Sequence, residues 1–144
     1  ESIELREGIL QLVLRSASAK TCSKFALSMC KQGNFASAER LYQRAWALHE
    51  TSSISTPKDK IDLLLELGKV KHTLGRYMEA EDTYKTCIEV CNATANKNLD
   101  KLKLQAWHNL SMLWSTRAAS ERDPKLAAIA SQIIHKVHQQ SMNI

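Results

Sequence analysis

The most informative segment of the chain reads Gly75-Arg76-Tyr77-Met78-Glu79-Ala80-Glu81-Asp82-Thr83-Tyr84-Lys85-Thr86-Cys87. A glycine is followed by an aromatic side chain at Tyr77, a small one at Ala80, an aromatic one at Tyr84 and a small one at Cys87. Spacings of three and four residues place these side chains on one face of an α-helix. The glycine can leave a preceding helix in a left-handed conformation at little steric cost. The segment therefore predicts a tight turn into a helix whose small residues let a second helix approach closely.

The same pattern occurs upstream, which indicates an internal repeat. At identical offsets stand Gly33, Phe35, Ala38, Tyr42 and Ala45. A repeat of a few tens of residues is typical of stacked helix pairs, in which each pair buries its apolar face against its neighbours. The repeat and the abundance of helix-forming residues together predict an all-α fold.

An apolar helix is predicted before each of the two glycines. The first runs near Ala19–Gln32 and the second near Pro57–Leu74. Thr56-Pro57-Lys58-Asp59 is a typical helix start, with a capping hydroxyl, proline at the first helical position and an acid in the first turn. Glycine inside a helix costs about 1 kcal/mol relative to alanine. We therefore expect a close helix–helix contact at Gly68.

The remaining sequence extends this organisation at both ends. Residues 2–16 read as a further amphipathic helix. A third unit begins with a helix near Asn98–Trp114, and a last helix starts after Asp123-Pro124 without a preceding Gly-x-aromatic turn. We predict one domain over residues 1–144, with a helix at 2–16 and units at about 19–50, 57–93 and 98–139. Since the chain starts without methionine, we interpret it as a piece of a larger protein.

The order of these residues resembles the tetratricopeptide repeat (TPR) family. The resemblance rests on Gly33, Phe35, Ala38, Tyr42, Gly68, Gly75, Tyr77, Ala80 and Tyr84. Units longer than the family's usual period are similar to those of kinesin light chains. The resemblance implies an α-solenoid of about three TPR-like helix pairs plus an N-terminal helix.

The resemblance also implies a groove that is lined by the first helix of each pair. The groove residues would be Lys20, Ser23, Leu27, Lys31, Asp62, Leu65, Lys69, His72, His108 and Met112, with Cys30, Thr73, Gln105 and Ser115 beside them. This mixture of basic, aliphatic and polar side chains suits an extended or helical peptide of some acidic character. We expect a non-catalytic scaffold that binds another protein.

Two other functions remain open at this stage. The chain could be a structural segment of a longer solenoid, or an oligomerisation module that associates with itself through apolar end faces. A less favoured alternative is an RNA-binding helical repeat. The net charge is only +5, the basic residues are spread along the chain, and each tryptophan lies on the apolar stripe of its helix.

Catalytic and metal-binding patterns are weak. His135-x-x-His138 lacks the usual glutamate and a third ligand, and Cys87 and Cys91 are more typical of small buried side chains than of a metal site. We therefore predict no enzyme activity, no metal and no cofactor. No apolar run approaches the roughly 18 residues that a membrane span needs. The four cysteines lack CxxC spacing and are typical of small buried thiols, and no secretion signal is recognisable. Both observations favour the reducing cytoplasm.

Overall fold

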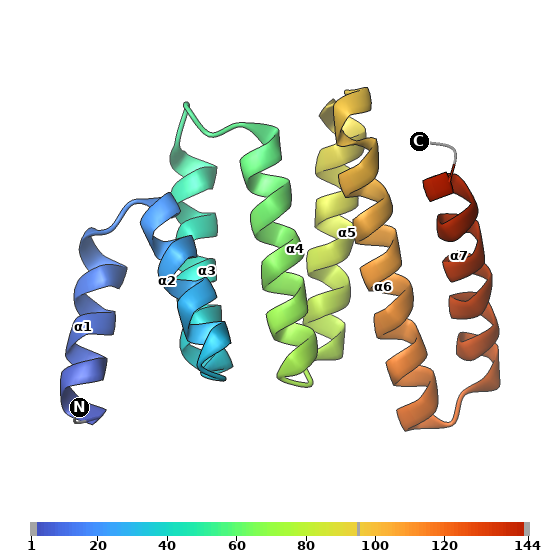
Figure 1. Ribbon diagram of the computed structural model, residues 1–144, viewed down its shortest axis with the longest axis horizontal. Coiled ribbons are helices and arrows are strands. Elements are labelled where there is room, and N and C mark those ends of the chain that lie inside the picture. Colours follow the sequence, from blue (N-terminus) through green and yellow to red (C-terminus); the bar gives the residue numbers. More distant parts are fainter. Residues whose placement is uncertain (1–2, 95, 143–144) are drawn as a thin grey trace. The chain divides into compact units, whose positions relative to one another are not determined.

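The computed structural model describes residues 3–94 and 96–142, and the regular secondary structure of this part of the chain consists of helices without a strand (Figure 1). The helices are α1 (Ile3–Ser16), α2 (Ala19–Lys31), α3 (Phe35–Thr51), α4 (Pro57–Thr73), α5 (Tyr77–Thr94), a 3₁₀ turn η1 (Lys97–Leu99), α6 (Asp100–Glu121) and α7 (Pro124–Met142). The prediction of an all-α fold is confirmed. Residue 2, where the predicted first helix starts, lies outside the described residues.

The chain divides between Ser55 and Thr56 into two compact units. Unit 1 contains α1 to α3, and unit 2 contains α4 to α7. Within the units, consecutive helices pack as pairs, α2 with α3, α4 with α5, and α6 with α7 (Figure 1). In unit 2, α6 also packs against both α4 and α5. This consecutive pairing is the solenoid-like arrangement that the internal repeat predicts.

The turns inside the three pairs share one backbone geometry. Gly33 and Gly75 adopt the left-handed conformation, with φ of 78° and 79°. Each turn closes with a hydrogen bond from the residue after the glycine to a carbonyl five residues earlier, from Asn34 N to Met29 O and from Arg76 N to Lys71 O. In the third pair Arg122 takes the left-handed position with φ of 53°, and the amide of the next residue bonds to a carbonyl in the same way. The expected role of the two glycines is confirmed.

The crossing of α4 and α5 depends on Gly68. A Cβ atom at this position would lie within 2.8 Å of three ring atoms of Tyr84, whose side chain is only 1% exposed. Such distances are too short for non-bonded carbon atoms. The predicted close contact at Gly68 is therefore confirmed.

The α4–α5 and α6–α7 pairs repeat the same pattern of buried positions. In α4 these are Leu63, Leu67, Gly68 and Val70, and in α6 they are Ala106, Leu110, Ser111 and Leu113, each 43 residues later. In the second helices, Ala80 and Cys87 of α5 correspond to Ala130 and Val137 of α7, each 50 residues later. Positions in the two pairs can therefore be compared one by one.

Helix α6 is longer than the sequence predicts. The predicted first helix of the third unit ends near Trp114, whereas α6 continues to Glu121. In this extension Ala118 is buried, and Arg117 forms ion pairs of 3.5 Å with both Glu81 and Glu121. These contacts stabilise additional helical turns that carry no strong local signal.

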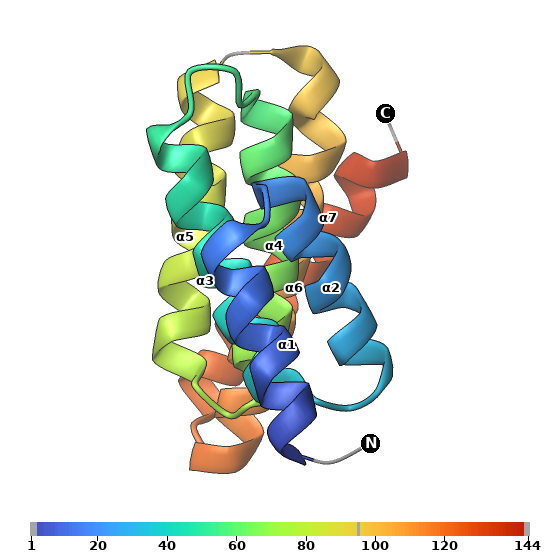
Figure 2. The same cartoon turned by 90° about the vertical axis from the view of Figure 1, so that its left-hand side faces the viewer.

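In unit 1, α1 lies beside α2 and α3 (Figure 2). Its inner face contributes Leu10, which is buried, to a cleft of about 810 Å³ that is also lined by Phe25, Met29 and Leu41. The opposite face of α1 is exposed. Helix α1 therefore belongs to unit 1 and leaves part of its apolar surface uncovered.

Candidate functional site

In unit 2 the predicted groove residues lie on α4 and α6, the first helices of two consecutive pairs, which contact each other. Asp62, Lys69 and His72 are on α4, and His108 and Met112 are on α6. Lys69 and Met112 occupy equivalent positions 43 residues apart. The structure thus brings a positively charged and an apolar groove residue onto matching positions of neighbouring helices.

Two ion pairs join charged side chains along the surface of α4. The Lys69 Nζ atom lies 3.2 Å from Glu66 Oε1, and the Lys58 Nζ atom lies 3.0 Å from Asp62 Oδ2. Exposed pairs of this kind contribute little to stability. The ammonium group of Lys69 can therefore exchange its partner for an external carboxylate at small energetic cost.

Two predicted groove residues of α4, His72 and Leu65, are less accessible than Lys69. The His72 ring contacts the Tyr77 ring edge to face at 5.7 Å between centroids, and burial lowers the pKa of His72 below its ordinary value. His72 is therefore neutral near pH 7 and can both donate and accept a hydrogen bond. Leu65 is only 6% exposed, so its side chain does not contribute to the exposed surface. Met112, at 45% exposure, supplies the accessible apolar group.

The groove residues predicted in unit 1 all lie on α2. Lys20 and Lys31 are exposed near its two ends, Ser23 is half-buried, and Leu27 is exposed. These residues provide the same basic and aliphatic chemistry as the α4–α6 residues, on a separate compact unit.

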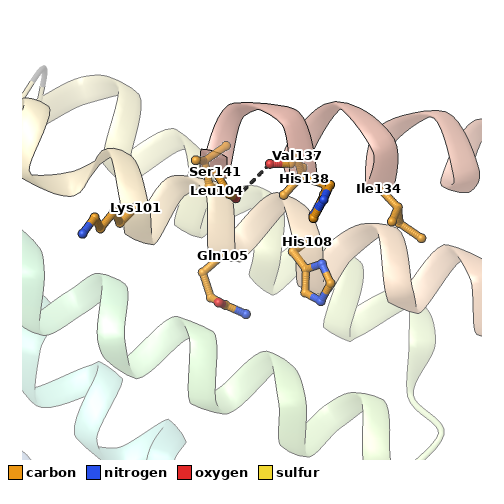
Figure 3. A pocket seen from close by; sticks show the side chains of 8 residues that line it. All are labelled: Lys101, Leu104, Gln105, His108, Ile134, Val137, His138 and Ser141. Carbon is orange, nitrogen blue, oxygen red and sulfur yellow. Dashed lines mark hydrogen bonds between the residues drawn. The ribbon is translucent and has the colours of Figure 1, made fainter. Parts of the chain in front are cut away.

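A cleft between α6 and α7 was not predicted from the sequence (Figure 3). Its volume is about 520 Å³, and it is lined by Lys101, Leu104, Gln105, His108, Ile134, Val137, His138 and Ser141. The cleft brings His108, a predicted groove residue, onto the same surface as His138 from the His-x-x-His motif. None of its eight residues is acidic, and α7 as a whole contains no aspartate or glutamate. That acid-free run was the available signal for this surface.

The cysteines of α5 are unsuited to reactions of a thiolate. Burial raises the pKa of the Cys87 thiol to about 12 and also raises the pKa of Cys91. The Cys87 Sγ atom donates a weak hydrogen bond to the Ile61 carbonyl, at 3.8 Å. A thiol that stays protonated is a poor nucleophile and a poor metal ligand. Across residues 3–94 and 96–142, no three His, Cys, Asp or Glu side chains are grouped to hold a metal ion.

Other polar side chains connect helices rather than forming an open site. The Trp114 indole donates a hydrogen bond of 2.8 Å to Glu81, which also lies 3.5 Å from both Lys85 and Arg117. This cluster joins α5 to α6. In unit 1, His49 Nδ1 and Ser55 Oγ lie 2.6 Å apart and connect the end of α3 to the segment that follows it.

Comparison with known proteins adds no relative to these observations. No protein-family model matches the chain, and a search of curated proteins returns no significant match. Among the described helices, none has both the length and the apolar character needed to cross a membrane.

Proposed function

We propose that this chain is a non-catalytic protein-interaction module of the TPR type, and that the α4–α6 surface of unit 2 binds a peptide or helix of another protein. The observation that carries the proposal is the matched exposure of Lys69 and Met112 on two first helices in contact. His108 lies one helical turn before Met112 on the same helix. Ammonium, thioether and imidazole groups are thus presented together on a rigid helical surface.

The chemistry of this surface favours a partner with both aliphatic and acidic side chains. Methionine is flexible and polarizable, so it adapts to apolar groups of different shape. Lys69 can pair with a carboxylate, and neutral His72 can form a hydrogen bond to the partner backbone. This combination supports recognition of an extended or helical peptide by a few anchoring groups, as the repeat pattern implies.

Two further features support the assignment to the TPR type and to a reducing compartment. The left-handed glycines, the small residues at the helix crossings and the buried tyrosines occupy the positions that the family pattern requires. None of the four cysteines lies in a disulfide, and Cys22, Cys87 and Cys91 are buried. We propose that the module works in the cytoplasm, where thiols of this kind persist.

The proposal can be tested by affinity capture from cell lysate with the wild-type chain and a Lys69→Ala/His108→Ala/Met112→Ala variant. A matched control carries Lys85→Ala, Gln132→Ala and Lys136→Ala on exposed positions of the second helices. We expect a protein that binds the wild type and the control but not the surface variant, with or without nuclease. That protein should then bind purified wild type directly, measured by calorimetry.

Two results would reject this function. Retention of the captured protein by the surface variant would place binding elsewhere on the chain. Loss of capture after nuclease treatment, with affinity that falls steeply as salt rises, would instead favour the RNA-binding alternative.

A further inference from the structure

The α6–α7 cleft lies at a position that another helix covers in the preceding pair. Helix α6 packs against α4 and α5, where Asn109 lies beside the Tyr84 hydroxyl, and Lys103 lies close to Cys91. Tyr84, Ile88 and Cys91 of α5 are consequently buried. Their equivalents in α7, 50 residues later, are Ile134, His138 and Ser141. All three line the cleft.

The cleft therefore has the shape and chemistry of an open helix-binding position. Leu104, Ile134 and Val137 form its apolar surface, and Val137 is already buried. Lys101 and His138 contribute basic groups to its lining, in which no side chain is acidic. A helix that presents aliphatic side chains and a carboxylate would complement it.

Helix α1 has these features on the face that unit 1 leaves uncovered. Leu5 and Leu12 lie two helical turns apart on this face, and their exposed fractions are 53% and 65%. Ile9, Leu10 and Val13 instead line the cleft inside unit 1. A helix with apolar side chains on two faces is expected to be covered on both. Glu4 stands next to Leu5 and places a carboxylate beside this outer face.

We propose that the α6–α7 cleft binds helix α1 of a second copy of the chain. Leu5 and Leu12 of one copy pack on the apolar surface of the cleft in the other. The Glu4 carboxylate pairs with the basic groups of the cleft lining, which contains no carboxylate. Because the two surfaces differ, the contact is head to tail and produces open chains or closed rings. This association goes beyond the proposed binding of another protein and uses a different surface, apart from His108.

Sedimentation velocity over a dilution series provides the first test. The cleft variant is His138→Glu/Ser141→Glu and the helix variant is Leu5→Glu/Leu12→Glu, all at exposed positions. The control, Gln132→Glu/Gln139→Glu, adds the same charges on the opposite face of α7. We expect wild type and control to gain mass with concentration, and both variants to bind at least about tenfold more weakly. Circular dichroism verifies that all four proteins remain helical.

Mixing the two variants distinguishes a head-to-tail contact from a symmetric one. The cleft variant retains an intact α1 and the helix variant retains an intact cleft, so an equimolar mixture should form a dimer that cannot extend. Glu4→Lys in the cleft variant should restore part of its association, because the charges are reversed on both surfaces. A wild type that stays monomeric at every concentration would overturn the proposal. So would association that one variant abolishes and the other leaves intact, which indicates a symmetric interface.

Discussion

The two helix pairs of unit 2 have the same geometry but different residues at the positions that create it. In α4–α5 the left-handed turn residue is Gly75, whereas in α6–α7 it is Arg122. At the helix crossing, Gly68 of α4 corresponds to Ser111 of α6, and both are buried. The comparison teaches that the pairing depends on small side chains at buried crossings and on one left-handed residue, rather than on the glycine motif itself.

The pairs also differ in what covers them. Helix α6 covers the surface of α4–α5 on which Tyr84, Ile88 and Cys91 are buried. The corresponding end of α6–α7 is open and carries His138 and Ser141 where α5 has Ile88 and Cys91. Polar groups at this end keep the open surface compatible with water while leaving an apolar cleft between them.

Ala80→Arg should have the largest effect on the α4–α5 pair. Ala80 is fully buried at the helix crossing, so arginine would add volume and an unpaired charge to a packed contact. We expect a loss of about 3 kcal/mol or more in the free energy of unfolding, measured by urea denaturation. Ala128→Arg, at an exposed position of α7, is the control and should change little. Unchanged stability of Ala80→Arg would disprove the alignment of the repeats.

Gly68→Ala should be destabilising although alanine is the better helix former. The added Cβ would overlap the buried Tyr84 ring, so we expect a loss of about 1–3 kcal/mol. Gly8→Ala in α1, where no atom lies within 4 Å of the added Cβ, should instead stabilise the chain by about 0.5–1 kcal/mol. Thermal and urea denaturation measure both effects.

The same site offers a direct exchange between the two pairs. The double substitution Gly68→Ser/Tyr84→Ile installs the residues that α6 and α7 carry at these positions. We expect it to be less destabilising than Gly68→Ser alone, as a double-mutant cycle would measure. If the effects of the two single substitutions on stability were simply additive, residues 68 and 84 would not be coupled, and the helix crossings of the two pairs would not be equivalent.

Substitutions at the left-handed turn residues Gly75 and Arg122 should change the free energy of unfolding in opposite directions. Gly75→Ala places a Cβ in the left-handed region and should cost about 1 kcal/mol, while Arg122→Gly removes that strain and should stabilise the α6–α7 pair by a similar amount. Denaturation curves of the two single variants provide the measurement. A neutral Arg122→Gly would mean that the arginine side chain compensates the strain through its own contacts.

Cys87→Val should have the smallest effect at neutral pH, since valine occupies the equivalent position 137 in α7. Burial raises the pKa of the Cys87 thiol to about 12, so the folded state prefers the protonated form. This stabilisation is complete below the ordinary thiol pKa and is lost as the pH rises towards 12. We therefore expect the valine variant to gain stability relative to wild type above about pH 9, in denaturation curves measured at increasing pH. Parallel pH profiles would show that Cys87 ionises equally well in both states.

The sequence was sufficient to predict turns and helix starts, because these depend on residues that are adjacent along the chain. The left-handed turns at Gly33 and Gly75, and the start of α4 with its capping box between Thr56 and Asp59, follow from the residues themselves. The extension of α6 could not be predicted, because it depends on the ion pair between Arg117 and Glu81, which are distant in sequence. The cleft beside α7 also escaped prediction, since its lining comes from two helices.

The sequence by itself determined the helix periodicity, the small crossing residues and the repeat, because these depend on spacing along one helix and on the conformational freedom of glycine. The tertiary structure alone decided which predicted groove side chains remain accessible. Leu65 is buried while Met112 is exposed, although both satisfy the same spacing rule. The physical reason is that exposure depends on which neighbouring elements cover a position. That covering is a property of packing between distant segments, and no local pattern records it.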